Sequence, residues 1–306
     1  MTLTELRYLV AVARERHFGK AAEACFVSQP TLSVAIKKLE EELDVKLFER
    51  GSNEVTVTAL GLEIVRQAQV VLEQVADLKE IARRGNDPVS GPLRLGVIYT
   101  IAPYLLPDLV QLSIARAPQM PLILQENFTV KLLEMLRAGE IDVAVLAEPF
   151  PDAGLATAAL YDEPFQIAVP KKHTLARRKR ISAEELKNET LLLLGTGHCF
   201  RDHVLEVCPE YAGFSSNADG IRKSFEGSSL ETIKYMVAAG MGVTVVPQLG
   251  VPAEPDRHIA YIPFADPGPT RRIVLAWRRS FTRYEAIAAL RNAIYACPLN
   301  GVQRLT

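Results

Sequence analysis

The sequence predicts a multidomain α+β protein, with a winged helix-turn-helix at the N-terminus, one long linker helix and a C-terminal α/β domain. Three observations support this prediction. Residues 1–57 contain short helical patterns followed by a short alternating stretch, and residues 58–85 form one uninterrupted helical pattern. From residue 91 onward, short runs of Val, Ile and Leu alternate with helical segments, which is typical of a sheet buried between helices.

The composition is that of a globular protein. The chain has 306 residues, a net charge of −1 and 48% hydrophobic residues, which favours two or three domains. Glu5, Arg7 and Arg14 interrupt the first apolar stretch, so it does not resemble a signal peptide. The longest uncharged run, residues 235–253, contains glycines and prolines that disfavour a membrane helix. We therefore expect a cytoplasmic protein that has no membrane contact and no cofactor.

The first helical segments predict a helix-turn-helix. Residues 3–16 carry one apolar face, residues 19–26 form a second short helix, and residues 31–43 form a third. Ser28 is a good N-cap, and Pro30 fits the first turn of the third helix, where its missing N–H costs nothing. The third helix is the expected recognition helix, which enters the major groove of double-stranded DNA by its N-terminal end. The residues expected at the DNA from this helix are Ser28, Gln29, Pro30, Thr31, Ser33 and Lys37.

These side chains suit DNA. Gln29 can make two hydrogen bonds to adenine, the hydroxyls reach bases or phosphates, and Lys37 suits a phosphate. No charged residue occurs from residue 24 to residue 36, so no carboxylate repels the backbone there. Residues 47–58 read as a hairpin with Arg50 and Ser52 near its tip, within reach of a phosphate or the minor groove. The alternative is a small helical bundle that binds a protein.

The long helix carries an apolar stripe close to a heptad pattern. Thr58 is a suitable N-cap, and the helix is expected to stop near Gly85. The apolar positions, three or four residues apart, are Leu60, Ile64, Ala68, Val71, Val75, Leu78 and Ala82. The stripe predicts a helix that forms a homodimer. The other interpretation is an amphipathic face packed on its own domain.

The C-terminal two-thirds predicts buried, mostly parallel strands between helices. The expected strands are Leu93–Ile98, Leu122–Glu126, Val143–Leu146, Gln166–Val169, Leu191–Leu194, Val243–Val246 and Ile273–Trp277. The expected helices are Pro103–Ala117, Val130–Ala138 and Ser229–Ala239.

Two of the four cysteines have surroundings that favour reaction. Cys25 and Cys297 lie among apolar residues, and we interpret them as buried, inert thiols. Cys199 is expected in the first turn of a helix, and Cys208 follows at the far end of that helix. The positive end of the helix dipole, with His198, Arg201 and His203 nearby, favours the reactive thiolate. Peroxide converts a thiolate to a sulfenic acid, which a second thiol converts to a disulfide.

Helix geometry makes this pair a switch. A helix of nine residues spans about 13 Å, whereas a disulfide requires Cα atoms within about 7 Å of each other. Oxidation would therefore unwind the segment 199–208. Two alternatives remain open from the residues alone. The thiols can be incidental, or His198, Cys199, His203 and Cys208 can form a metal site, although their spacing matches no familiar zinc pattern.

The segments 21–43 and 47–50 resemble the winged helix-turn-helix of LysR-type transcriptional regulators. The motif Gly240-Met-Gly-Val-Thr-Val-Val-Pro247 is similar to one in the regulatory domain of that family. The resemblance covers essentially the whole chain. It implies double-stranded promoter DNA and RNA polymerase as partners, and a homodimer through the 58–85 helix that assembles further into a tetramer.

The resemblance also implies a domain organisation. Residues 1–57 would be the DNA-binding domain, residues 58–90 the linker helix and hinge, and residues 91–306 the regulatory domain. The regulatory domain would consist of two subdomains resembling a periplasmic binding protein, about 91–162 with 268–306, and about 163–267. The chain would cross between them near residues 161–164 and 264–269, with a signal site in the cleft.

Within this family, Gly197-His-Cys-Phe-Arg-Asp202 and the cysteine at 208 resemble the hydrogen-peroxide-sensing group, the OxyR proteins. The resemblance implies that Cys199 is the peroxidatic cysteine and Cys208 the resolving one. It implies a peroxide pocket of Thr100, Thr129, His198, Asp202 and Arg271, with the adjacent Arg272 as the alternative arginine. The implied function is activation of antioxidant genes rather than enzymatic catalysis. The alternatives are a LysR-type regulator that responds to a metabolite in the cleft and a thiol peroxidase.

Overall fold

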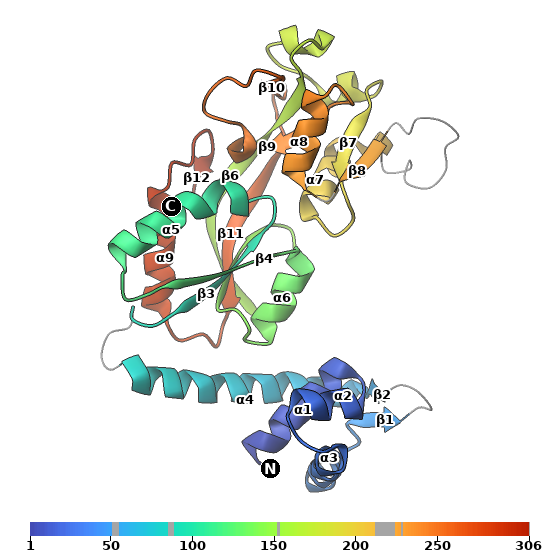
Figure 1. The fold of residues 1–306 in the computed structure, drawn as a ribbon, viewed down its shortest axis with the longest axis vertical. Helices are drawn as coiled ribbons and strands as arrows, with labels where there is room; N and C mark the ends of the chain where they lie inside the picture. The colour runs from blue at the N-terminus through green and yellow to red at the C-terminus, as the bar shows by residue number, and fades with distance from the viewer. Residues whose placement is uncertain (51–54, 85–88, 152–153, 212–223, 228, 306) are drawn as a thin grey trace. The chain divides into compact units, whose positions relative to one another are not determined.

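The computed structural model describes residues 1–50, 55–84, 89–151, 154–211, 224–227 and 229–305 (Figure 1). The chain divides into two compact units, one of residues 1–87 with 137–139 and the other of residues 88–136 with 140–306. Within these described ranges, the first unit has one hydrophobic core and the second unit has two.

The first unit is a helix-turn-helix with a two-stranded wing. Its elements are α1 (Leu3–Glu15), α2 (Phe18–Ala24), α3 (Gln29–Leu43), β1 (Phe48–Arg50), β2 (Val55–Val57) and α4 (Ala59–Arg84). A capping box between Thr2 and Glu5 begins α1, and Ser28 is the N-cap of α3 as expected. The wing pairs antiparallel, with Phe48 opposite Val57. Leu32, Ile36 and Leu39 of α3 are buried in the core of this unit.

The stripe on α4 divides into two parts. Ile64, Ala68 and Val71 pack into the core of the first unit, which is the intramolecular interpretation. Leu60 and Leu78 are 47% and 68% exposed, so they are not part of that core. Thr58 caps the helix, because its Oγ1 accepts a hydrogen bond from the Gly61 N–H at 2.9 Å. The helix ends at Arg84, and residues 85–88 of the expected hinge lie outside the described residues.

The second unit is built from strands and helices that mostly match the predicted ones. Its strands are β3 (Leu93–Ile98), β4 (Leu122–Asn127), β5 (Val143–Ala147), β6 (Leu155–Pro170), β7 (Leu191–Leu194), β8 (Ser224–Gly227), β9 (Thr244–Pro247), β10 (Ile259–Pro263), β11 (Thr270–Arg278) and β12 (Gln303–Arg304). Its helices are α5 (Ala102–Arg116), α6 (Thr129–Arg137), α7 (Cys199–Val207), α8 (Leu230–Ala238) and α9 (Tyr284–Ala296). Short 3-10 helices occur at Thr174–Arg177, Ala183–Leu186, Pro209–Tyr211 and Gln248–Gly250.

The prediction of mostly parallel strands is wrong for the large sheet. Its strand order is β10-β6-β11-β5-β3-β4, with β9 and β12 also paired to β6. β3 runs parallel to β4 and β5, but β6 is antiparallel to β9, β10, β11 and β12. Hydrophobic runs report burial and not strand direction, which explains the error. The edge strand β4 is also more exposed than expected, with Ile123 53% exposed.

The long strand β6 belongs to both halves of this sheet. Up to Pro164 it pairs with β11, and from Phe165 it pairs with β9 and β10. The other expected crossing segment lies beside it, because the Phe165 N–H donates to the Pro269 carbonyl at 3.0 Å. The two chain segments therefore pass together from one half of the sheet to the other.

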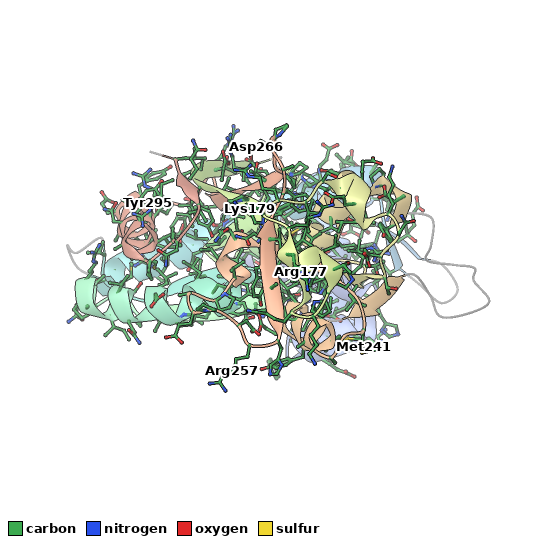
Figure 2. All side chains as sticks on the ribbon, turned by 90° about the horizontal axis from the view of Figure 1, so that it is seen from above. Arg177, Lys179, Met241, Arg257, Asp266 and Tyr295 are labelled. Atoms are coloured by element: carbon green, nitrogen blue, oxygen red, sulfur yellow. The ribbon has the colours of Figure 1, made fainter. Side chains whose placement is uncertain are left out.

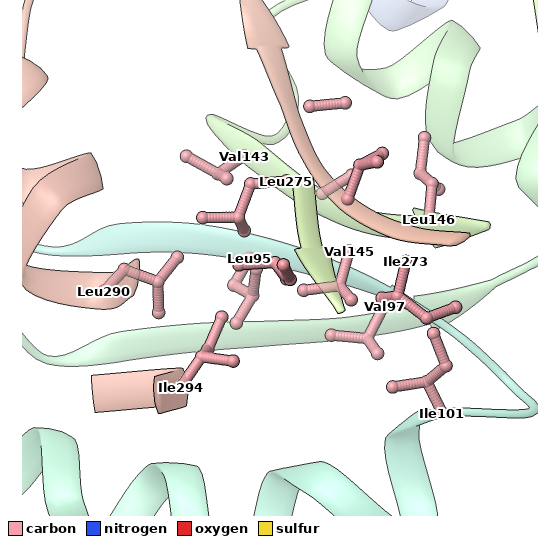
Figure 3. Packing of buried hydrophobic residues seen from close by; sticks show 14 of the residues in the cluster. Leu95, Val97, Ile101, Val143, Val145, Leu146, Ile273, Leu275, Leu290 and Ile294 are labelled. Carbon is pink, nitrogen blue, oxygen red and sulfur yellow. The ribbon is translucent and has the colours of Figure 1, made fainter. Parts of the chain in front are cut away.

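Each half of the second unit has its own core. In one core, side chains of β3, β5 and β11 pack against α9, as Figure 3 shows for Leu95, Val145, Leu275, Leu290 and Ile294. The other core joins the end of β6 to β7, β9 and β10 and to helices α7 and α8. Because α7 buries Phe200 and Val204 in this second core, its position is fixed by packing.

A basic segment follows β6 on the surface. Between residues 171 and 180 lie exposed lysines and arginines, including Arg177 and Lys179 (Figure 2). Arg180 forms an ion pair with Asp266, and Arg178 forms one with Glu185 at 3.2 Å. Positive charge is thus concentrated locally in a chain whose net charge is −1. In the described part of the chain, no helix is long and apolar enough to span a membrane.

Candidate thiol site and DNA-binding surface

The N-terminal end of α3 presents the polar side chains that the sequence predicted. Ser28, Gln29, Pro30, Thr31 and Lys37 are exposed, and Ser33 is half-buried. Ser28 Oγ accepts from the Thr31 N–H at 3.3 Å and lies 2.8 Å from Thr31 Oγ1. Ser28 is thus engaged in holding the start of the helix, which leaves Gln29 as the side chain best suited to a base.

For the remaining residues expected at the DNA, the structure gives either an ion pair within the protein or no description. Lys37 lies 3.6 Å from Glu41 one turn along α3, so its charge is partly shared on the helix surface. Arg50 ends β1, and its side chain and Ser52 lie outside the described residues.

The two cysteines of the candidate thiol site lie at the two ends of α7. Cys199 is the first residue of the helix and is half-buried, and the N-cap is His198. Cys208 is the C-cap and is fully buried. Burial raises the pKa of the Cys208 thiol to about 12, so this group stays protonated near neutral pH. The helix is the predicted nine residues long, which separates the two cysteines by about 13 Å.

A small cavity opens beside Cys199. Three segments line it, namely Ile98–Thr100 after β3, Asn127–Thr129 after β4 and Gly197–Cys199 before α7. Its volume is about 10 Å³, close to the smallest space that holds one water molecule. Thr129 Oγ1 is buried and has no hydrogen-bond partner among the described residues. An unpaired buried hydroxyl is costly, so it indicates a place where a small polar molecule binds.

Three aromatic rings, those of Tyr99, Phe128 and His198, belong to the wall of this cavity. Phe128 packs edge-on against Tyr99, with ring centroids 5.2 Å apart, and against His198, with centroids 4.8 Å apart. Tyr99 lies 5.8 Å from the His198 ring. The three rings hold the segment before Cys199 against the other two segments of the cavity wall. Gly197 adopts φ +97°, a conformation that side chains rarely allow, which lets the backbone enter α7 at this point.

Arg271 reaches this site from the start of β11. Its Nη1 donates to Thr100 Oγ1 at 2.8 Å, and its Nη2 donates to the Thr100 carbonyl at 3.2 Å. Its guanidinium also lies 4.9 Å from the centre of the Phe200 ring. Arg272 instead pairs with Asp162 at the surface, at 2.8 Å. Of the two adjacent arginines, Arg271 is therefore the one that faces the site.

Two protein-family models, each for a different domain, match the chain. The model described as a bacterial regulatory helix-turn-helix protein of the lysR family matches residues 3–62, and that of the LysR substrate binding domain matches residues 86–296. A "Hydrogen peroxide-inducible genes activator" of Pectobacterium carotovorum subsp. carotovorum is 42% identical over 292 residues, which is 94% of this chain and 95% of that protein. This chain belongs to the OxyR group of the LysR family.

Solved structures of the family are similar over nearly the whole chain. A full-length OxyR of Pseudomonas aeruginosa with a cysteine-to-aspartate substitution has a TM-score of 0.74 and 47% identity, covering 97% of this chain and 98% of that one. A hydrogen-peroxide-bound OxyR of Corynebacterium glutamicum with a cysteine-to-serine substitution has a TM-score of 0.62 and 34% identity, covering 96% of this chain and 91% of that one. The family fold therefore extends through both units.

Two of the residues that the family resemblance assigned to the pocket, Asp202 and Arg271, do not line the cavity itself. Asp202 is exposed on α7 and is absent from the cavity wall. Arg201 donates to the Leu194 carbonyl at 3.0 Å, and His203 Nε2 pairs with the Glu148 carbonyl at 2.8 Å. Burial lowers the pKa of His203, so this ring is neutral near pH 7 and supplies no positive charge. Of the three basic residues expected to favour the Cys199 thiolate, His203 therefore contributes no positive charge near pH 7.

The alternative of a metal site has no support among the described residues. No group of three or more His, Cys, Asp or Glu side chains in that part of the chain is arranged to hold a metal ion. The helix explains this, because α7 separates Cys199 from Cys208 by its whole length.

Sequence reasoning missed Glu163, Tyr99 and Phe128. Glu163 is fully buried opposite Arg271 on the adjacent strand, and Asp162 lies opposite Arg272. Two acidic residues in one segment and two arginines in another were the available signal. It can be interpreted only when the strand register is known, because the segments are more than a hundred residues apart.

Proposed function

We propose that this chain is a DNA-binding transcriptional regulator that senses hydrogen peroxide through Cys199. The observation that carries the proposal is the small cavity beside Cys199, whose wall includes Thr129, a residue with a buried hydroxyl that has no hydrogen-bond partner in the described part of the chain. The hydrogen-peroxide-bound relative supports the same choice of ligand. The helix-turn-helix would bind promoter DNA through Ser28, Gln29, Pro30, Thr31, Ser33, Lys37 and Arg50.

The proposed chemistry has two balanced steps. The Cys199 thiolate attacks one peroxide oxygen, the S–O bond forms, the O–O bond breaks, and the hydroxide that leaves takes a proton to become water. The Cys208 sulfur then attacks the sulfenic sulfur, the S–S bond forms as the S–O bond breaks, and the hydroxide that leaves takes up the proton that Cys208 loses to become a second water. In this proposal Thr100, Thr129 and His198 line the pocket of the first step, and Arg271 supports it by donating to the Thr100 hydroxyl. We place Asp202 outside it, as a residue of the helix that unwinds.

The order of these steps follows from burial. Cys208 is fully buried, with a pKa of about 12, so it is a poor nucleophile while α7 is folded. Disulfide formation therefore requires α7 to unwind from the second core. Unwinding withdraws Phe200 from Arg271 and from Phe165, whose ring lies 5.1 Å from that of Phe200. This change is the proposed signal that alters DNA binding and activates antioxidant genes.

The metabolite-responsive alternative is less well supported. Pockets for drug-sized ligands typically have volumes of about 300–1,000 Å³, whereas the cavity at Cys199 has about 10 Å³. The space between α5 and α8 is spanned by Tyr104, whose hydroxyl donates to Glu231 at 2.5 Å. A metabolite in the cleft would have to separate these groups.

We further propose that the chain acts in the cytoplasm as a homodimer through the exposed part of α4, that dimers form tetramers, and that RNA polymerase is the partner in activation. The two subdomains would meet at β6, with residues about 91–162 and 268–306 in one and about 163–267 in the other. Residues 1–57 would bind DNA, and residues 58–90 would link the two functions.

A DNA footprint of the reduced and the peroxide-treated protein tests the function. The footprint of the wild-type protein should change after peroxide alone, and that of Cys199→Ser should not. Cys297→Ser is the control for replacing a thiol elsewhere, because Cys297 is a buried free cysteine that does not line the cavity. A footprint that changes with a carboxylate metabolite but not with peroxide would support the alternative function instead.

A further inference from the structure

Glu163 is a carboxylate that lies wholly inside the second unit. It is 0% exposed, and its cross-strand neighbour is Arg271. One oxygen, Oε2, accepts from Arg271 Nε at 2.9 Å and lies 2.8 Å from Nη2. The other oxygen, Oε1, accepts from the Leu249 N–H at 2.8 Å. Burying two such ions is expensive unless they are paired, so each fixes the position of the other.

We infer that Glu163 is a positioning residue for the oxidation of Cys199, because it holds Arg271 in the orientation that directs the Thr100 hydroxyl proton into the cavity. The inference rests on the proposed function. It concerns the protein residues behind the pocket rather than those that touch the peroxide.

The direction of the hydrogen bonds carries the argument. A guanidinium only donates, so Thr100 Oγ1 must accept from Arg271 Nη1, at 2.8 Å. A hydroxyl has one proton, and this proton is then free to be donated elsewhere. Thr100 lines the cavity, so the oxygen of a bound molecule is within its reach. The guanidinium charge behind Thr100 polarises the hydroxyl and strengthens that donation.

This arrangement matches the charge that develops in the reaction. When the Cys199 thiolate attacks one peroxide oxygen, the electron pair of the O–O bond moves to the second oxygen, which leaves as hydroxide and is protonated from solvent. A donor fixed in advance at that oxygen stabilises the transition state more than the bound peroxide. Thr100 donates a hydrogen bond and loses no proton, so the positioning residues are unchanged after each turnover.

Glu163 holds Arg271 from a strand outside α7. Besides Glu163 and the Thr100 hydroxyl, the partners of the guanidinium among the described residues include the Thr100 carbonyl at 3.2 Å and the face of the Phe200 ring at 4.9 Å. Phe200 belongs to α7, which must unwind in the second step. Glu163 belongs to the continuous strand β6 and accepts from Leu249, so it stays in place when α7 changes.

The rate of sulfenic acid formation tests this role in the full-length chain. A Cys208→Ser background stops the reaction at the sulfenic acid, which a dimedone probe and mass spectrometry quantify. Glu163→Gln should lower the second-order rate constant about 10- to 100-fold, the effect of misplacing one donor to a developing charge. Asp162→Asn is the matched control, because it breaks the neighbouring surface pair with Arg272 and should leave the rate unchanged.

The sign of the change separates positioning from charge. If Glu163 acted only through its negative charge, its removal would leave Arg271 uncompensated, favour the Cys199 thiolate and increase the rate. A rate equal to or above that of the parent, in a variant with unchanged circular dichroism, overturns the inference. If Glu163→Gln fails to fold, Glu163→Asp keeps the charge and shortens its reach, and it should still slow the reaction.

A double-variant cycle with Thr100→Val completes the test. If Glu163 acts through Thr100, the double variant should oxidise no more slowly than Thr100→Val alone. A double variant whose rate loss equals the product of the two single losses would show that Glu163 does not act through Thr100. Failure of the proposed function has a different signature, because the Cys208→Ser parent itself would then form no sulfenic acid at Cys199.

Discussion

Cys199 and Cys208 are the first residue and the C-cap of the same helix, so α7 itself keeps the two sulfurs apart. One thiol opens on a cavity and the other is fully buried in a hydrophobic core. This separation gives the two cysteines unequal chemistry in a single continuous segment, and it makes the folded helix the reduced state of the proposed switch.

The first prediction concerns these unequal roles. Cys199→Ser should abolish the response to peroxide, because no thiolate then faces the cavity. Cys208→Ser should still react and should accumulate a trappable sulfenic acid at Cys199. Peptide mapping under non-reducing conditions should detect a 199–208 linkage in the oxidised wild-type protein, and hydrogen exchange should increase across α7. A Cys199→Ser footprint that still shifts with peroxide would refute the thiol switch.

The second prediction separates function from stability at Thr129. Its buried Oγ1 has no partner among the described residues, so Thr129→Val should leave the free energy of unfolding unchanged or raise it by about 1 kcal/mol. The same variant should slow the oxidation of Cys199 about tenfold or more, because a donor to the peroxide is lost. Denaturant unfolding and dimedone trapping measure the two effects.

The control for Thr129→Val is Ser113→Ala. Ser113 on α5 is also buried, and its hydroxyl has no hydrogen-bond partner among the residues that the structure describes, but it does not line the cavity. Its removal should have a similar effect on stability and none on the oxidation rate. Equal rates for the two variants would place the peroxide elsewhere.

The third prediction concerns pH. Burial raises the pKa of Cys208 from about 9 in the unfolded chain to about 12 in the folded one. The folded state holds the proton more tightly, so the stabilisation is present below pH 9 and is lost as the pH rises toward 12. The stability difference between reduced wild type and Cys208→Ala should shrink by about 1 kcal/mol between pH 8 and pH 10. Urea unfolding at the two pH values measures this, and a constant difference would contradict the burial of Cys208.

The fourth prediction concerns base reading by α3. Gln29→Ala should weaken binding to the specific site by about 1–3 kcal/mol and binding to random DNA much less. Lys37→Ala is the contrast, because a phosphate contact should be lost about equally on both DNAs and should reduce the salt dependence. Fluorescence anisotropy at several salt concentrations distinguishes the two. An equal loss on both DNAs for Gln29→Ala would show that Gln29 does not read bases.

The fifth prediction concerns assembly through α4. Leu78 is 68% exposed, so Leu78→Glu should weaken the dimer without unfolding the first unit. Ile64 packs in the core of that unit, so Ile64→Glu should lower the stability of the first unit by about 1–3 kcal/mol whatever the oligomeric state. Analytical ultracentrifugation and thermal melting separate these outcomes. A Leu78→Glu variant that sediments like the wild type would exclude this part of α4 from the interface.

Local patterns were sufficient for most of the fold. The bounds of β3 and β7 match the predicted ranges, and the N-cap at Ser28 matches because capping depends on a few adjacent residues. The long strand β6 was predicted only at residues 166–169. Near its start, residues 156–159 are small and alternate between half-buried and exposed positions. Such a segment resembles a loop when its partner β11 is unknown. The sequence periodicity also carried no information on strand direction.

In the candidate site too, the features that depend on adjacent residues could be predicted, and those that depend on distant contacts could not. The position of Cys199 at a helix start depends on adjacent residues, and it could be predicted. The contact between Arg271 and Thr100 spans 171 positions, and that between Arg271 and Glu163 spans 108. Such contacts depend on strand register and on the packing of α7, neither of which a single sequence specifies. The family resemblance assigned both Arg271 and Asp202 to the pocket; neither lines the cavity, but Arg271 hydrogen-bonds to Thr100, which does.

The size of the cavity also bears on which oxidants the chain can distinguish. A space of about 10 Å³, lined by three aromatic rings, is near the smallest that holds one water molecule and leaves no room for a carbon skeleton. An alkyl hydroperoxide brings a carbon skeleton that would have to displace Phe128 or His198 before its oxygen could approach the sulfur. Discrimination between inorganic and organic peroxides would then arise from steric exclusion at the entrance, without any residue that recognises the difference chemically.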